Sequence, residues 1–185
     1  MARHSDNTRE SIIDAAEQVV IEAGASNLTF EAVASKAGIS RGGLLHHFPD
    51  KESLLKAMLD RFKKHMDESR KKMKMRNETS TGPEREAVVY VKTCLAEDIG
   101  KYKHVTAAIL ASGAHSPELL DTARSRYRQT LVDLTKDGLS FERAAVITLA
   151  TQGLRLMEVL SVSPFNDGER RKIVKELLSL AELIQ

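Results

Sequence analysis

The 185-residue chain has one cysteine, no tryptophan and only four prolines. Because Cys94 has no second cysteine to pair with, a disulfide scaffold is excluded, and a lone thiol suits a reducing compartment. Apolar runs are short, and none approaches the roughly 20 residues that a membrane-spanning helix needs. The first ten residues are polar and of mixed charge, unlike a signal or transit peptide. We therefore expect a cytoplasmic protein without a membrane partner.

The chain also lacks a charge of one dominant sign. Its 28 Lys and Arg side chains face 26 Asp and Glu side chains, and the net charge is +2. One local excess lies at residues 61–76, where eight basic side chains accompany only Asp67 and Glu68. Runs of this kind are usually solvated helix faces. Charge alone therefore does not indicate a nucleic-acid partner.

Catalytic signatures are missing as well. The sequence has no Gly-rich phosphate loop, no His-Glu-x-x-His zinc motif, no cysteine pair and no Gly-x-Ser-x-Gly elbow. The six histidines are scattered, and the adjacent His46 and His47 would point about 100° apart on a helix, which does not suit a shared metal. We expect no enzyme activity, no cofactor and no metal.

What the chain does have is helical periodicity along almost its whole length. Cap residues and glycines divide the pattern into about nine helices, and no segment alternates convincingly as a strand, so we expect an all-α fold. Residues 77–83, Asn-Glu-Thr-Ser-Thr-Gly-Pro, form a polar, turn-forming linker. We expect residues 1–50 to form one domain that continues into a connecting helix over residues 50–76. Residues 77–185 would form a second domain.

The most informative segment is residues 29–51, TFEAVASKAGISRGGLLHHFPDK, with two short helical stretches around a tight turn. Thr29 and Ser40 are good N-cap residues for the two helices. Gly38 suits a turn that needs a positive φ, and Leu44 fills the space between the helices. The pattern predicts a helix-turn-helix.

The second helix of such a pair fits the major groove of DNA, with its N-terminal residues against the base edges. Arg41 lies at that end, where a guanidinium can contact guanine or phosphate, and Gly42 and Gly43 let the backbone approach the duplex. Helix starts add N–H groups that attract phosphate. A helical hairpin without a ligand is the alternative. We predict nine DNA-binding residues: Thr29, Ser40, Arg41, Gly42, Gly43, Leu45, His46, His47 and Lys51.

Over about residues 6–60 the chain resembles the DNA-binding domain of TetR-family transcriptional regulators, with the spacing TF-x-x-VA-x-x-AGIS-x-G-x-L-x-x-HF-x-x-KE-x-LL. The resemblance implies an all-helical homodimer with an N-terminal DNA reader and a C-terminal regulatory domain. It also implies phosphate contacts by Thr29 and Lys51. Two positions depart from the family: Gly43 stands where Ser or Thr is common, and Leu45 where Tyr is common. Both lack the hydroxyl, and Leu45 could instead rest against a thymine methyl.

Residues 84–185 contain no motif of the family that we recognise, but the resemblance implies a ligand pocket among the middle helices and a dimer interface from the last two. Those two helices are expected over residues 140–162 and 168–184. For each set of residues, the alternative is a role in the core or on the surface of one subunit. The candidate ligand-binding residues are Tyr90, Cys94, His104, Tyr127, Arg155 and Met157. The candidate interface residues are Ala145, Leu149, Leu156, Leu177, Leu178 and Ala181.

With three tyrosines and five phenylalanines as its only aromatic side chains, the chain would line a pocket mainly with aliphatic groups. Such a lining favours an apolar or amphipathic effector. We expect a sequence-specific regulator that binds double-stranded DNA at a palindromic operator as a homodimer, and a repressor that a small apolar effector releases. The alternatives are an activator or an effector-independent DNA-binding protein of the same fold, and, from another class, a helical protein–protein adaptor or an enzyme that has borrowed the hairpin.

Overall fold

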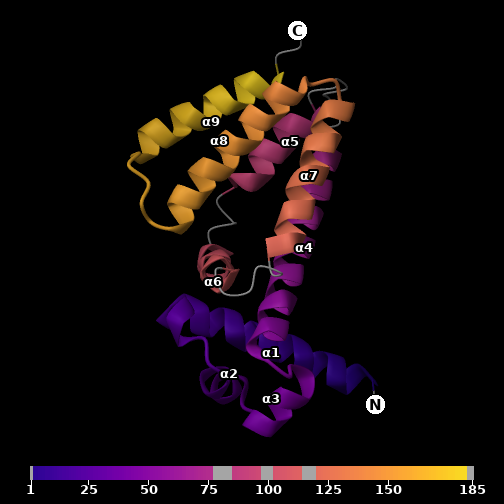
Figure 1. Ribbon diagram of the computed structural model, residues 1–185, viewed down its shortest axis with the longest axis vertical. Coiled ribbons are helices and arrows are strands. Elements are labelled where there is room, and N and C mark those ends of the chain that lie inside the picture. The colour runs from indigo at the N-terminus through magenta and orange to yellow at the C-terminus, as the bar shows by residue number, and fades with distance from the viewer. Residues whose placement is uncertain (1, 77–84, 97–101, 114–119, 183–185) are drawn as a thin grey trace. The chain divides into compact units, whose positions relative to one another are not determined.

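The computed structural model describes residues 2–76, 85–96, 102–113 and 120–182. Within these ranges the chain is all helical, with nine α-helices and one short 3-10 helix (Figure 1), as the periodicity predicts. The expected linker at residues 77–83 lies outside the described residues. The helices are α1 (Ala2–Ala23), α2 (Phe30–Ala37), α3 (Arg41–His47), α4 (Lys51–Arg76), α5 (Arg85–Cys94), α6 (Lys103–Gly113), α7 (Asp121–Lys136), α8 (Phe141–Val159) and α9 (Asp167–Glu182).

The chain divides into two compact units, and α4 contributes to both. The first unit holds residues 1–63 and 101–120, and the second holds residues 64–100 and 121–185. Helix α6 joins the first unit because it packs against α1 and the 3-10 helix Ala25–Asn27. The sequence-based division placed α6 with the second domain, since it follows the linker in the chain. Contacts and chain order therefore divide the molecule differently at this helix.

Helix α1 forms the centre of the first unit and packs against both α2 and α6. Its inner stripe includes Ile12, Ile13 and Val20, all fully buried, and Gly24 ends the helix with φ +86°. Arg61 of α4 reaches α1, where its guanidinium pairs with Glu10 at 2.6 Å and also with Asp14. This arrangement ties the first turns of α4 to the helix that supports α2.

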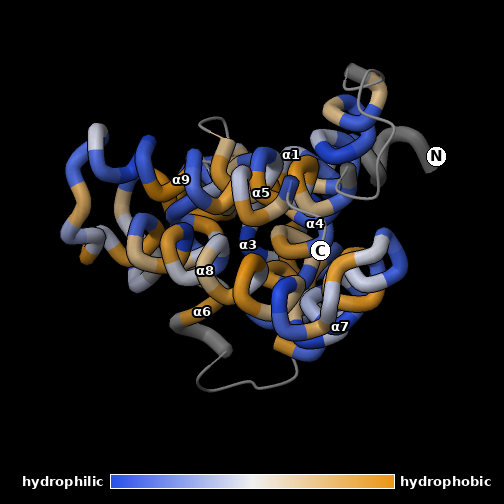
Figure 2. The backbone as a smooth tube through the Cα atoms, turned by 90° about the horizontal axis from the view of Figure 1, so that it is seen from above, coloured by the Kyte–Doolittle hydropathy of each residue, from blue (hydrophilic) through white to orange (hydrophobic). Residues whose placement is uncertain are grey.

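The second unit is a helical bundle in which α5 packs against α7, α8 and α9, and α8 also packs against α7 and α9. In Figure 2, hydrophobic and hydrophilic residues alternate along these helices, the pattern expected where only one side of each helix is buried. Fully buried core residues include Val89 and Val91 on α5, Leu134 on α7 and Ile147 on α8. No helix in the described ranges is long and apolar enough to span a membrane.

Candidate functional site

Residues 29–51 form the predicted helix-turn-helix, and their caps act as expected. The Thr29 hydroxyl accepts a hydrogen bond from the Ala32 amide at 3.2 Å, which starts α2. Gly38 ends α2 in the left-handed conformation with φ +68°, where a side chain is disfavoured. The Ser40 hydroxyl then accepts from the Gly43 amide at 3.0 Å and starts α3. The short turn between two capped helices fixes the direction of α3.

The two faces of this motif differ sharply in exposure. Val33, Ala34, Leu44 and Phe48 are buried and hold α2 and α3 against the rest of the unit. Of the nine predicted DNA-binding residues, eight are exposed and His47 is half-buried. Every one of them is therefore accessible to a partner on this surface. The exposed eight are Thr29, Ser40, Arg41, Gly42, Gly43, Leu45, His46 and Lys51.

Arg41, at the first turn of α3, is held from α2. Its Nε lies 2.9 Å from the Glu31 carboxylate, and both side chains are mostly exposed. Because an exposed ion pair of this kind contributes about 0–1 kcal/mol, the guanidinium can exchange Glu31 for another acceptor at little cost. The close approach at Gly43 is also visible: a Cβ there would lie 3.3 Å from the Ser40 hydroxyl. A side chain at this position would press on the cap.

Four of the six predicted ligand-binding residues gather around a side chain that the sequence reading did not single out, Gln152 of α8. Its amide Nε2 donates to the Tyr90 hydroxyl at 2.8 Å and to the Cys94 sulfur at 3.6 Å. Its carbonyl oxygen accepts from Tyr127 at 3.4 Å and from Arg155 at 3.5 Å. Side chains from α5, α7 and α8 thus meet at one amide.

The buried face of α8 also carries two threonines close to Gln152 in the sequence. Thr148 and Thr151 lie one turn apart and are buried, and within the described residues neither hydroxyl has a hydrogen-bond partner. Burial raises the pKa of the Tyr90 phenol and of the Cys94 thiol. Both groups therefore stay protonated near neutral pH and act as neutral hydrogen-bonding groups. The spacing Thr148, Thr151, Gln152 was the available signal, because it places three polar residues on one helical face.

The remaining two predicted ligand-binding residues lie elsewhere. His104 is exposed on α6 in the first unit, and Met157 is 40% exposed on α8. The expectation of a mainly aliphatic lining does not describe the surroundings of Gln152, where hydroxyl, thiol, amide and guanidinium groups meet. The low aromatic content of the chain did not reveal this polarity, because a few polar residues that meet in the fold are enough to make a lining polar.

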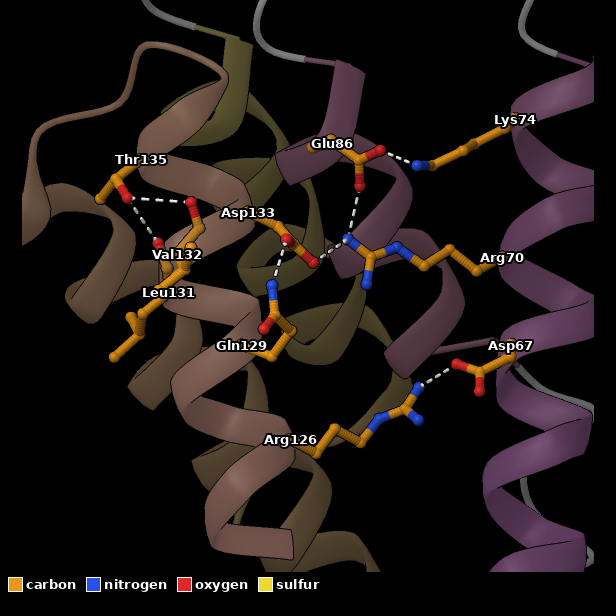
Figure 3. Close-up of polar contacts among 10 residues, drawn as sticks. All are labelled: Asp67, Arg70, Lys74, Glu86, Arg126, Gln129, Leu131, Val132, Asp133 and Thr135. Atoms are coloured by element: carbon orange, nitrogen blue, oxygen red, sulfur yellow. Dashed lines mark hydrogen bonds and ion pairs between the residues drawn. The ribbon is translucent and has the colours of Figure 1, made fainter. Parts of the chain in front are cut away.

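A cleft of about 460 Å³ in the second unit is lined only by charged side chains, and by none of the predicted ligand-binding residues. Figure 3 shows the ion pairs that cross it: Arg70 and Lys74 of α4 both contact Glu86 of α5, and Arg70 also faces Asp133 of α7. Beside it, Arg126 of α7 pairs with Asp67 at 2.9 Å. The other lining residues are Lys71, Lys136 and Asp137.

The exposed apolar surface of the second unit lies mainly on α8. Two predicted interface residues are part of it: Leu149 is 72% exposed and Leu156 is 43% exposed. Ala145 and Leu178 are half-buried. The exposed large apolar side chains of this helix are Phe141, Val146, Leu149, Leu156 and Met157.

The other two predicted interface residues, Leu177 and Ala181, lie on α9. Both are buried within the single chain, where α9 packs against α5 and α8. The physical reason is that the apolar stripe of α9 covers the core of its own subunit. Residues already buried in this way cannot form an exposed contact surface.

These features define a helix-turn-helix DNA-binding protein with a helical second domain. A family model described as "Bacterial regulatory proteins, tetR family" matches residues 12–58, and one described as "Tetracyclin repressor-like, C-terminal domain" matches residues 84–182. The chain therefore belongs to the TetR family, and it is a helix-turn-helix transcriptional regulator. The resemblance noted from the spacing of residues 29–51 is confirmed.

Three known proteins illustrate the likeness. The transcriptional repressor BepR of Brucella suis biovar 1 (strain 1330) is 41% identical over 54 residues, which cover 29% of this chain and 26% of BepR. The chain thus matches only about a quarter of that relative's length. A transcriptional regulator from Rhodococcus sp. Rha1 has a TM-score of 0.77 at 22% identity, covering 94% of this chain and 95% of that one. The multidrug binding protein EbrR, complexed with imidazole, has a TM-score of 0.65 at 21% identity, covering 91% and 88%.

At these identities the two solved structures establish the fold. Regulators of the TetR family bind DNA and small-molecule effectors and are dimers.

Proposed function

We propose that this protein is a repressor that binds a palindromic operator as a homodimer through residues 29–51 and leaves it when a small molecule binds the second domain. The observation that carries the proposal is the separation of faces in the helix-turn-helix, with a buried apolar side and an exposed side that bears Arg41 and two glycines. BepR, a repressor, supports the direction of regulation, and EbrR, a multidrug binding protein, supports a small-molecule effector.

Arg41→Ala and Lys51→Ala should weaken operator binding in different ways. If Arg41 contacts a base, its loss should cost about 1–3 kcal/mol and relax the preference at one position of each half-site. Lys51 opens α4, where a phosphate contact is independent of sequence, so its loss should weaken all sequences alike and reduce the salt dependence. Fluorescence anisotropy at several salt concentrations, with a selected operator and a scrambled duplex, measures both effects.

Lys72→Ala is the matched control, since Lys72 is an exposed lysine of the same helix in the second unit. It should leave operator binding unchanged. If Arg41→Ala and Lys51→Ala bind the operator as tightly as the parent, the assignment of contacts is wrong. Operators selected from genomic fragments also distinguish repression from activation, because a repressor site overlaps the promoter that it controls.

The proposed effector binds within residues 84–160, at the Gln152 cluster. The tyrosine, thiol and amide groups around Gln152 support a ligand with a hydrogen-bonding group, and the two buried threonine hydroxyls of α8 offer further donors. Buried polar groups without partners are rare, and a bound ligand or water commonly satisfies them. This argues for an amphipathic effector rather than a wholly apolar one.

An effector should raise the melting temperature of the free protein and yet lower operator affinity, about 5- to 150-fold for a typical coupling free energy. Gln152→Leu should abolish that response while the operator affinity of the free protein stays at the parent level. Gln129→Leu, on the exposed side of α7, is the control and should respond normally. A screen in which ligands stabilise the protein but never alter operator binding would contradict a regulatory pocket.

A further inference from the structure

The charged cleft of the second unit shares no lining residue with either site proposed above. It is formed by one face of α4, where Arg70 and Lys71 lie about one turn before Lys74, and by Lys136 and Asp137 at the end of α7. Its volume of about 460 Å³ lies within the range of about 300–1,000 Å³ typical of small-molecule sites. Neither Gln152 nor any residue of the helix-turn-helix lines it.

Most of the charges in this cleft already have partners. Glu86 contacts both Arg70 and Lys74 (Figure 3), so one carboxylate serves two cations. Asp133 accepts a hydrogen bond from Gln129 at 2.8 Å and lies 3.9 Å from Arg70. These pairs neutralise the middle of the cleft.

Three charged groups at the cleft remain without an ion pair among the described residues: Lys71, Lys136 and Asp137. Partial desolvation and the nearby Asp133 raise the pKa of the Asp137 carboxyl, while Lys74 and Arg70 act to lower it. A further cation beside the carboxylate would favour its charged form. The unsatisfied groups are thus of both signs.

We propose that this cleft binds a small zwitterion, a ligand that carries a carboxylate or phosphate group together with an amine. The anionic group is taken by Lys71 and Lys136, and the amine is taken by Asp137. A simple anion would meet Asp137 and Asp133, whereas a simple cation would meet the two lysines and Arg70. Only a ligand with both signs avoids repulsion from one half of the lining.

The test is isothermal titration of the full chain, without DNA, with three probes of similar size. L-Glutamate carries both signs, succinate is a simple dianion and putrescine is a simple dication. We expect L-glutamate to bind at millimolar concentration and at least tenfold more tightly than either of the others, because charge-assisted hydrogen bonds at both ends are then satisfied. Lys136→Gln and Asp137→Asn should each weaken L-glutamate about tenfold or more.

Lys72→Gln is the matched control, since it removes a lysine from α4 that does not line the cleft. It should leave L-glutamate binding unchanged. Far-ultraviolet circular dichroism checks that each variant is folded. If succinate binds as tightly as L-glutamate, the cleft is an anion site and the proposal is overturned. If putrescine binds as tightly, the cleft is a cation site and the proposal is likewise overturned. The proposal also fails if no probe binds, which makes the ion pairs structural, or if neither Lys136→Gln nor Asp137→Asn weakens binding. This titration is done without DNA, so its result is independent of whether the protein binds the proposed operator.

Discussion

Leu149→Glu and Leu156→Glu are each expected to convert the proposed homodimer into monomers and to lower operator affinity by about 100-fold or more. The two leucines lie seven residues apart on α8, hence on one face, and they are 72% and 43% exposed in the single chain. Apolar side chains of this size at such exposure mark a contact surface. A glutamate there would have to be buried without a partner in a dimer, and separated subunits would read each half-site alone.

Analytical ultracentrifugation at micromolar concentration measures the first effect, and anisotropy with a two-half-site operator measures the second. Met75→Glu is the matched control, because Met75 is also 72% exposed but lies on α4. It should remain dimeric. A parent protein that sediments as a monomer, or a Leu149→Glu variant that stays dimeric, would overturn the proposal that α8 forms the interface.

Helix α9 shows why a dimer surface is hard to predict from sequence. An apolar stripe at helical spacing indicates that a face is buried, but not against which partner. Leu177 and Ala181 have that spacing and are buried by their own α5 and α8, whereas Leu149 lies on the exposed side of a helix whose other side is core. Periodicity therefore predicted the helices correctly and left the partner of each face open.

The helix-turn-helix was predictable because its determinants are local. Thr29 and Ser40 cap helices within three residues of themselves, and Gly38 supplies the left-handed turn between them. Each signal acts on the adjoining backbone, so neighbouring residues suffice to recognise it. The exposure of the second helix then follows from which of its residues must face inward.

The polar sites of the second unit depend instead on residues far apart in the chain. Gln152 contacts Tyr90 and Cys94, which lie about 60 positions earlier, and Glu86 joins two cations of a preceding helix. In the sequence, a lone glutamine among small residues and a basic run on a long helix both resemble ordinary surface. Only the packing of α4, α5, α7 and α8 brings these groups together.

Two adjacent leucines of α3 give the sharpest test of the proposed division between core and DNA-facing residues. Leu44 is fully buried and Leu45 is 39% exposed, although they are chemically identical neighbours. Leu44→Ala should lower the free energy of unfolding by about 2–5 kcal/mol, the usual cost of removing a buried leucine side chain. It should therefore weaken operator binding only because α3 is no longer held in place.

Leu45→Ala should do the reverse. Its effect on stability should stay within about 0.5 kcal/mol, as for most surface substitutions, while operator affinity falls because an apolar contact to the duplex is lost. Urea unfolding and anisotropy on the same preparations separate the two effects, and lowering the temperature should restore binding to Leu44→Ala but not to Leu45→Ala. If Leu45→Ala binds the operator like the parent, this side chain does not face the DNA. If Leu44→Ala leaves the free energy of unfolding unchanged, Leu44 does not belong to the core. The exposed surface assigned to residues 40–47 is then wrong as well, because it depends on which side of α3 faces inward.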